Sequence, residues 1–162
     1  MSTAKADSSV SSDQTGVERR ERLHKTIESL VQLRQKVIVG YCRLAGVSSL
    51  DNRDDETFVV KADQLRSFCQ VMVDYTAMGH FEIYQRIIEG KERRRAVKEV
   101  AEEVYPAIAE TTDFLVDFND KYDAFSGTDD DVKILSGDLS RLGEIIVVRG
   151  ELEDRLLEAL KR

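Results

Sequence analysis

The sequence has few of the residues that interrupt helices or build reactive sites. Its 162 residues include one proline, nine glycines, no tryptophan, two cysteines and two histidines. Scarce proline and glycine, with abundant leucine, valine, glutamate, arginine and lysine, favour an all-helical protein. Two cysteines, Cys42 and Cys69, are too few for a disulfide framework, so we expect reduced, buried thiols.

Long apolar runs and an excess of positive charge are missing too. No apolar stretch approaches about twenty residues and no signal-peptide core is present, so we expect no membrane span and a cytoplasmic protein. The net charge of −7 argues against direct nucleic-acid binding and suits either a basic protein partner or plain solubility. We interpret one basic run, residues 91–98, as a solvated helix face or loop.

Motifs of catalysis are also missing. The sequence contains no nucleophile elbow, phosphate loop, dinucleotide fingerprint or pair of histidines at metal-binding spacing. Asp74 and His80 are a conceivable general-base pair, but six residues and a glycine lie between them, so no contact is assured. The acidic triplet at residues 129–131 lacks the spacing of a calcium loop. We expect no enzyme activity, no metal and no cofactor.

Four stretches repeat apolar residues at steps of three and four, which is typical of bundled helices. They run from Leu23 to Leu44, from Leu65 to Ile88, from Val97 to Phe125 and from Leu135 to Leu160. The pattern predicts an all-α, up-and-down bundle of about four main helices in one domain, residues 17–162. Residues 1–16 are polar and predict a disordered tail, and residues 47–60 predict an acidic loop.

Two residues interrupt the helical pattern. Gly79 sits where a helix would end, because glycine takes the left-handed conformation at low cost, so we predict a helix, a sharp turn and a second helix. Pro106 lacks a backbone donor and predicts a kink or a break in the third stretch.

Charged residues also occupy the apolar stripes. Arg34 lies on the first stripe and either extends to solvent along its own stem or is paired inside the bundle. Arg149 and Glu153 lie four residues apart on the last stripe. The sequence leaves open whether these residues form buried pairs or surface contacts.

The densest aromatic and apolar segment spans residues 68–88, FCQVMVDYTAMGHFEIYQRII. Its apolar stripes are Leu65, Phe68, Met72 and Tyr75 before Gly79, and Phe81, Tyr84 and Ile88 after it. On a helical wheel Asp74 lies roughly 140° from the centre of the first stripe, and Val73 lies about 120° away on the other flank. Either Val73 packs on a neighbouring helix and Asp74 is solvated, or Asp74 and the aromatic pair after Gly79 form a protein-binding surface.

This segment resembles the signature of the Rsd/AlgQ family, the regulators of the bacterial primary sigma factor. The family pattern is approximately F-C-x-x-L-V-D-Y-x-S-A-G-H-F-x-I-Y-E-R-I. It is matched here by Phe68, Cys69, Val73, Asp74, Tyr75, Gly79, His80, Phe81, Ile83, Tyr84, Arg86 and Ile87. The closing segment, LSRLGEIIVVRGELEDRLLEAL, resembles the family pattern L-S-x-L-G-E-x-x-x-x-R-x-x-L-E-D-x-L. With two weaker blocks, the resemblance covers about residues 27–160.

The resemblance implies an anti-sigma factor. Such a protein binds region 4, the C-terminal promoter-recognising domain of the primary sigma factor, and sequesters it from core RNA polymerase. Alternative sigma factors are then favoured in stationary phase, and one branch of the family tunes alginate and virulence genes. Some relatives also engage a phosphotransfer protein or a stringent-response enzyme.

We expect Asp74 to face a basic group of the sigma domain and Phe81 to supply an apolar anchor. His80, Tyr84, Arg34 and Tyr41 are further candidates, which alternatively line a pocket between helices. A different class of function stays open, because long apolar seams also suit a homodimeric structural or adaptor bundle that does not bind sigma.

Overall fold

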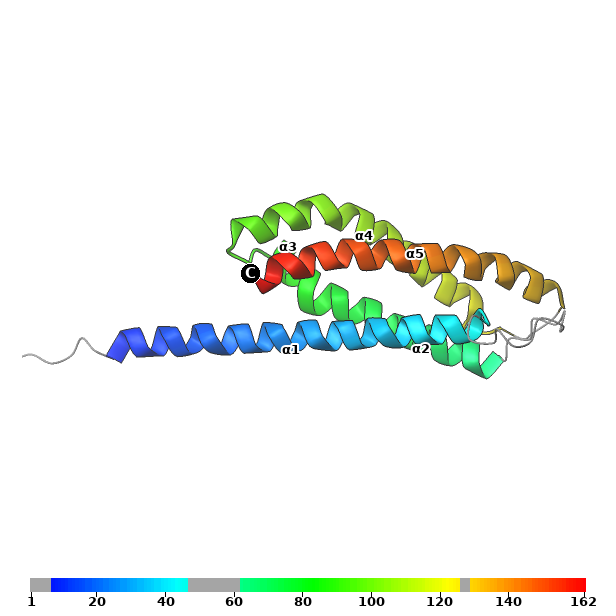
Figure 1. Cartoon of the computed structure of the whole chain (residues 1–162), viewed down its shortest axis with the longest axis horizontal. Helices are drawn as coiled ribbons and strands as arrows, with labels where there is room; N and C mark the ends of the chain where they lie inside the picture. Colours follow the sequence, from blue (N-terminus) through cyan, green and yellow to red (C-terminus); the bar gives the residue numbers. More distant parts are fainter. Residues whose placement is uncertain (1–6, 47–61, 126–128) are drawn as a thin grey trace, which may run out of the picture.

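The chain forms a bundle of long helices. The computed structural model describes residues 7–46, 62–125 and 129–162, and within these ranges it contains helices and no strand. Its elements are α1 (Asp7–Leu44), α2 (Ala62–Met78), η1 (Gly79–Tyr84), α3 (Gln85–Ile88), α4 (Arg95–Tyr122) and α5 (Asp129–Lys161). Figure 1 shows α1, α2, α4 and α5 running alternately up and down. The predicted all-α, up-and-down bundle is confirmed.

The start of α1 differs from the prediction for this segment. Residues 1–6 of the predicted tail and the predicted loop at 47–60 lie outside the described residues. From Asp7 to Gly16, where we predicted disorder, the chain is helical. A helix that is already nucleated adds one hydrogen bond for each further residue, and no proline interrupts this segment. None of the helices in the described ranges has the length and hydropathy needed to cross a bilayer.

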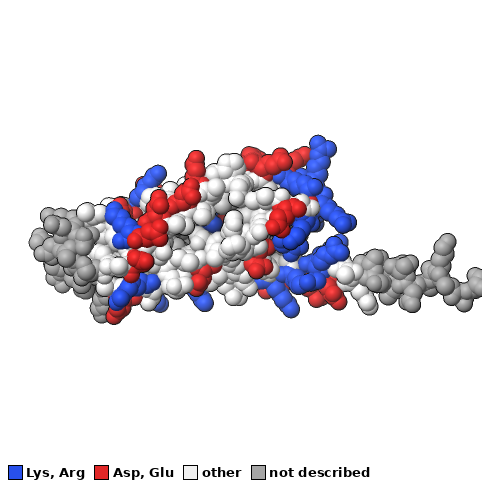
Figure 2. All heavy atoms as spheres, turned by 180° about the vertical axis from the view of Figure 1, so that it is seen from behind, with Lys and Arg blue, Asp and Glu red and all other residues white. Residues whose placement is uncertain are grey.

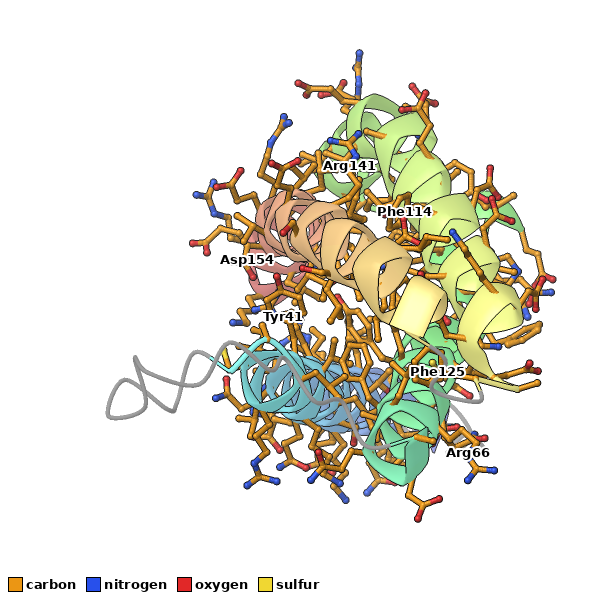
Figure 3. All side chains as sticks on the ribbon, turned by 90° about the vertical axis from the view of Figure 1, so that its right-hand side faces the viewer. Tyr41, Arg66, Phe114, Phe125, Arg141 and Asp154 are labelled. Carbon is orange, nitrogen blue, oxygen red and sulfur yellow. The ribbon has the colours of Figure 1, made fainter. Side chains whose placement is uncertain are left out.

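The apolar stripes predicted from the sequence meet in one core. Leu30 of α1, Leu65 of α2, Ile108 of α4 and Leu142 of α5 are each at most 1% exposed. Figure 3 looks along the bundle and shows side chains filling the space between the helices. Both cysteines are free thiols; the side chain of Cys69 is buried, and that of Cys42 is half-buried. The core therefore follows the steps of three and four along each helix.

Helices α1 and α5 approach closely at Tyr41. Its hydroxyl donates a hydrogen bond to the backbone oxygen of Leu139, at 2.9 Å. Gly143 lies opposite, where an added Cβ would overlap the Tyr41 hydroxyl. Figure 3 shows Tyr41 between the two helices. Tyr41, a predicted partner contact, therefore has a packing role in the bundle.

Helix α4 continues through Pro106. The helix is unbroken from Arg95 to Tyr122 with the proline inside it, so the predicted alternative of a break is wrong. Figure 1 shows α4 arching along its length beside α5. The missing proline donor removes one backbone hydrogen bond. Packing along the rest of the helix outweighs that loss, since α4 buries eight residues, among them Val104 and Ile108 on either side of the proline.

Candidate functional site

The helix that begins as α2 does not turn at Gly79. Met78 has helical angles, φ −62° and ψ −47°, and Gly79–Tyr84 continue as a π-helix, which leads directly into α3. The predicted sharp turn is therefore wrong. A π-helix closes its hydrogen bonds over five residues instead of four, so one turn takes up about one extra residue. The helix axis continues, while the residues that face the core change.

Gly79 packs closely against the interior of the bundle. A Cβ at this position would lie 3.2 Å from Cε2 of Tyr84 and 3.7 Å from Nη2 of Arg149. The left-handed glycine that ends the element is Gly90, with φ 75°. The N–H of Lys91 donates to the oxygen of Arg86 at 3.0 Å, which satisfies an end carbonyl of the helix.

The π-helical segment changes the register of the apolar stripe. The steps of three and four put Phe81, Tyr84 and Ile88 on one apolar stripe, but Phe81 is 62% exposed and Ile88 is 58% exposed. The buried residues are Ile83 and Tyr84, at 2% and 4% exposure. On an uninterrupted α-helix Phe81 would already face away from the buried stripe of α2, and the extra residue taken up by the π turn brings Tyr84 to the core side.

Four side chains form an exposed surface on this helix, which we call the α2 face: Val73, Asp74, His80 and Phe81. Asp74 accepts a hydrogen bond from Nε2 of Gln70 at 3.1 Å. The rings of His80 and Phe81 meet edge to face, with centroids 4.9 Å apart. Asp74, His80 and Phe81 are all exposed, on α2 and on the π turn that continues it. The structure thus leaves three of the predicted site residues exposed on one continuous helix.

The other predicted candidates, Tyr84 and Arg34, lie in a buried polar cluster around Glu153. Glu153 of α5 is 1% exposed. The hydroxyl of Tyr75 donates to its Oε1, and the hydroxyl of Tyr84 donates to its Oε2 at 2.9 Å. Two guanidinium groups are near: Nε of Arg149 lies 3.7 Å from Oε2, and Nη1 of Arg34 lies 3.8 Å from Oε1. One carboxyl group therefore links α1, α2, η1 and α5.

Arg149 connects this cluster to α4. Its side chain is 1% exposed, and its Nη1 donates to the hydroxyls of Thr111 at 3.0 Å and Thr112 at 2.7 Å. The guanidinium also lies over the Tyr75 ring, 5.2 Å from the centroid. Its Nε donates no hydrogen bond within the described part of the chain. Arg149, which lies on the apolar stripe of α5, is thus a buried charge with several partners.

Arg34 joins the cluster to the surface. Its side chain is 18% exposed, and its Nη1 lies 2.7 Å from Oδ1 of Asp154, a carboxylate that is itself 62% exposed. The same Nη1 donates to the backbone oxygen of Gly150 at 3.4 Å. The sequence left open whether Arg34 extends to solvent or is paired inside the bundle, and both apply in part. Its stem lies along the bundle interior, and its guanidinium reaches a partner at the surface.

Burial controls the ionisation of this cluster. Loss of hydration raises the pKa of Glu153 to about 8, against the opposing pull of Arg34. Burial also raises the pKa of the Tyr84 hydroxyl to about 12 and lowers the pKa of Arg149. The fold therefore favours a protonated Glu153 at neutral pH.

Because burial makes ionisation of Glu153 unfavourable, the difference in free energy of unfolding between the wild type and Glu153→Gln should depend on pH. The pKa of Glu153 rises from 4.5 to about 8 on folding, so the stability that the proton provides is complete below about pH 4.5 and is lost as pH rises through 8. One pKa unit corresponds to about 1.4 kcal/mol. Between pH 5 and pH 9 we expect the free energy of unfolding of the wild type to fall by about 2–4 kcal/mol relative to the variant, in urea titrations.

Glu158→Gln, an exposed glutamate on the same helix, is the matched control and should show no such trend. A difference between wild type and Glu153→Gln that stays constant with pH would contradict the burial argument.

The buried cluster and the α2 face share one structural segment. Gly79 packs against Tyr84 and near Arg149, while His80 and Phe81 project outward from the same π turn. Tyr84 is held by Glu153, so the cluster fixes the segment that presents the two exposed rings. The cluster thus positions the surface without contributing to it.

The site predicted from the sequence did not include Tyr75, Thr111, Arg149 or Glu153. Tyr75 and Thr111 look like ordinary members of apolar stripes. The available signal was the pair Arg149 and Glu153, two charges one turn apart on a buried seam. Among the described residues no group of three or more histidine, cysteine, aspartate or glutamate side chains is placed to hold a metal ion.

Fold and site define a helical-bundle protein with an exposed acidic and aromatic face. The family model for the regulator of the RNA polymerase sigma(70) subunit, Rsd/AlgQ, matches residues 10–161. A regulator of sigma D from Yersinia enterocolitica is 30% identical over 136 residues, covering 83% of this chain and 80% of the relative. A regulator of sigma D from Enterobacter sp. (strain 638) is 30% identical over 135 residues, covering 83% and 79%. No solved structure matches. The chain belongs to the Rsd/AlgQ family of sigma(70) regulators.

Proposed function

We propose that the protein is an anti-sigma factor that binds region 4 of the primary sigma factor through the α2 face. The family match over residues 10–161 is the observation that carries the proposal. Bound in this way, the protein sequesters the sigma factor from core RNA polymerase in the cytoplasm and favours alternative sigma factors in stationary phase.

The chemistry of the α2 face suits this partner. Region 4 reads promoter DNA and therefore has a basic surface, which an acidic protein attracts. The chain has a net charge of −7, and Asp74 on the α2 face is exposed. Phe81 is 62% exposed and Val73 is 38% exposed, so apolar area is available beside the charge. Binding would bury an aromatic anchor and oppose Asp74 to a basic group.

The remaining predicted contacts take supporting roles in this proposal. Tyr84 and Arg34 hold the π turn through Glu153, and Tyr41 holds α1 against α5. We propose that His80 acts at the edge of the contact, where its ring orients Phe81. The phosphotransfer protein and the stringent-response enzyme engaged by some relatives are proposed as further partners, without an assigned surface.

A calorimetric titration with purified region 4 tests the proposal. We expect binding at micromolar concentrations that weakens as salt rises from about 0.05 M to about 0.3 M. Asp74→Ala should weaken binding at least fivefold, about 1 kcal/mol, because a charge opposite a basic group is lost. Asp117→Ala removes an exposed carboxylate from α4 and should bind like the wild type.

No binding at micromolar concentrations would reject the anti-sigma function. Light scattering after size exclusion addresses the alternative function. A tight dimer that Asp74→Ala or Phe81→Ala dissociates would favour the homodimeric adaptor.

A further inference from the structure

Four basic side chains line one hollow of about 380 Å³ at an end of the molecule. Arg19 and Arg22 come from α1, Arg86 comes from α3, and Lys91 comes from the segment that leads into α4. Figure 2 shows lysine and arginine side chains gathered at the end where α1 extends past the bundle. No carboxylate from the described part of the chain lines this hollow.

Three of these charges have no carboxylate partner among the side chains that the structure describes. Some exposed arginines elsewhere are paired, since Arg141 lies 2.9 Å from Glu144 and Arg155 lies 2.7 Å from Glu103, whereas others, such as Arg43 and Arg93, form no ion pair within the described ranges. Within the same ranges Arg19, Arg22 and Arg86 form no ion pair, although the chain has an excess of acidic residues.

Two carboxylates close in sequence to Lys91 already have partners. Glu89 lies 2.9 Å from Nζ of Lys91 and accepts a hydrogen bond from Gln85 at 2.7 Å. Glu92 attracts Arg86 at longer range, but its ion pair is with Arg94 at 2.8 Å. No ion pair in the described part of the chain engages the three arginines, so an anion placed between them would be attracted by each.

The lining defines the chemistry of the anion. Arginine forks bind phosphate oxygens with two parallel hydrogen bonds, and three such forks suit more than one phosphate group. Among the described residues no aromatic or aliphatic side chain lines the hollow, so they offer no platform for a base or sugar ring. The volume falls within the range of small-ligand pockets, about 300–1,000 Å³. We propose that this hollow binds a small polyanion with two or more phosphate groups.

Such a ligand would join two parts of the fold. Residues 14–22 of α1 are exposed, with Val17 at 55%, so this end of α1 has little packing of its own. A polyanion held by Arg19 and Arg22 on one side and Arg86 on the other would tie α1 to α3. This proposal is independent of the sigma factor, because none of the four residues belongs to the α2 face.

Isothermal titration with inorganic triphosphate tests the site on the full-length protein. We expect a dissociation constant below about 1 mM at moderate salt, with pyrophosphate weaker and orthophosphate weaker still. ATP, which carries the same phosphate chain on a nucleoside, should bind with similar affinity. Arg22→Gln and Arg86→Gln should each weaken triphosphate binding about tenfold, and Lys91→Gln should weaken it less. Arg66→Gln and Arg141→Gln, which remove paired arginines elsewhere, should leave it unchanged.

Hydrogen exchange supplies a second readout. Bound triphosphate should slow amide exchange in residues 18–23 of the wild type, and Arg86→Gln should abolish that protection although Arg86 is on another helix. Equal weakening in Arg66→Gln and Arg86→Gln, or no binding at millimolar triphosphate, would overturn the proposal. Tighter binding of a polyglutamate peptide than of triphosphate would also overturn it, since the site would then take acidic protein segments.

Discussion

Arg149→Ala is expected to lower the free energy of unfolding by about 3–5 kcal/mol. The side chain is 1% exposed, and its loss leaves a cavity among four helices. It also removes the donor to Thr111 and Thr112 and the cation above the Tyr75 ring. Urea titration monitored by circular dichroism measures the change.

Two comparisons separate the buried charge from a general effect of losing arginine. Arg155→Ala removes an arginine that is 49% exposed and paired with Glu103, and should cost less than about 1 kcal/mol. The double variant Arg149→Met and Glu153→Met replaces both charges with apolar volume and should recover much of the loss. If Arg149→Ala costs no more than Arg155→Ala, the cluster does not hold the four helices together.

Phe81→Ala is expected to weaken binding of region 4 by at least about thirtyfold, or 2 kcal/mol. An aromatic ring that is 62% exposed in the free protein has most of its surface to lose to a partner. The free energy of unfolding should change by less than about 0.5 kcal/mol, because little of the ring is packed in the fold. Calorimetric titration and urea unfolding measure the two quantities on the same sample.

The matched control for Phe81 is Val147→Ala on α5, an apolar residue that is 61% exposed. Its affinity for region 4 should equal that of the wild type. If Phe81→Ala binds region 4 as tightly as the wild type, Phe81 is not an anchor of the interface. If the variant loses folding stability in parallel with affinity, the ring has a structural role.

The sequence predicted the helices and their buried stripes because both depend on short-range periodicity. Leu135, Leu139 and Leu142 follow the seam of α5 and are buried. Asp74 was placed on the outer side of α2 by its angle on the wheel, and it is exposed there. These outcomes need only the geometry of one α-helix.

The geometry of a single α-helix could not predict the π turn or the buried cluster. A glycine in a helical pattern is compatible with a cap, and only the close approach of Tyr84 and Arg149 shows why Gly79 is there. The partners of Glu153 are 78 and 69 residues away at Tyr75 and Tyr84, so no local spacing reveals them. Tyr84, predicted either as a partner contact or as lining a pocket between helices, is a buried donor to Glu153.

The most direct test of the central claim is a map of the surface that region 4 covers. Backbone amide resonances of the labelled protein would be followed by NMR as unlabelled region 4 is added. The account predicts the largest shifts at the α2 face, around Val73, Asp74, His80 and Phe81, with smaller shifts on α4 and α5. Shifts that cluster around Val116 and Val147 and leave the α2 face unchanged would contradict it.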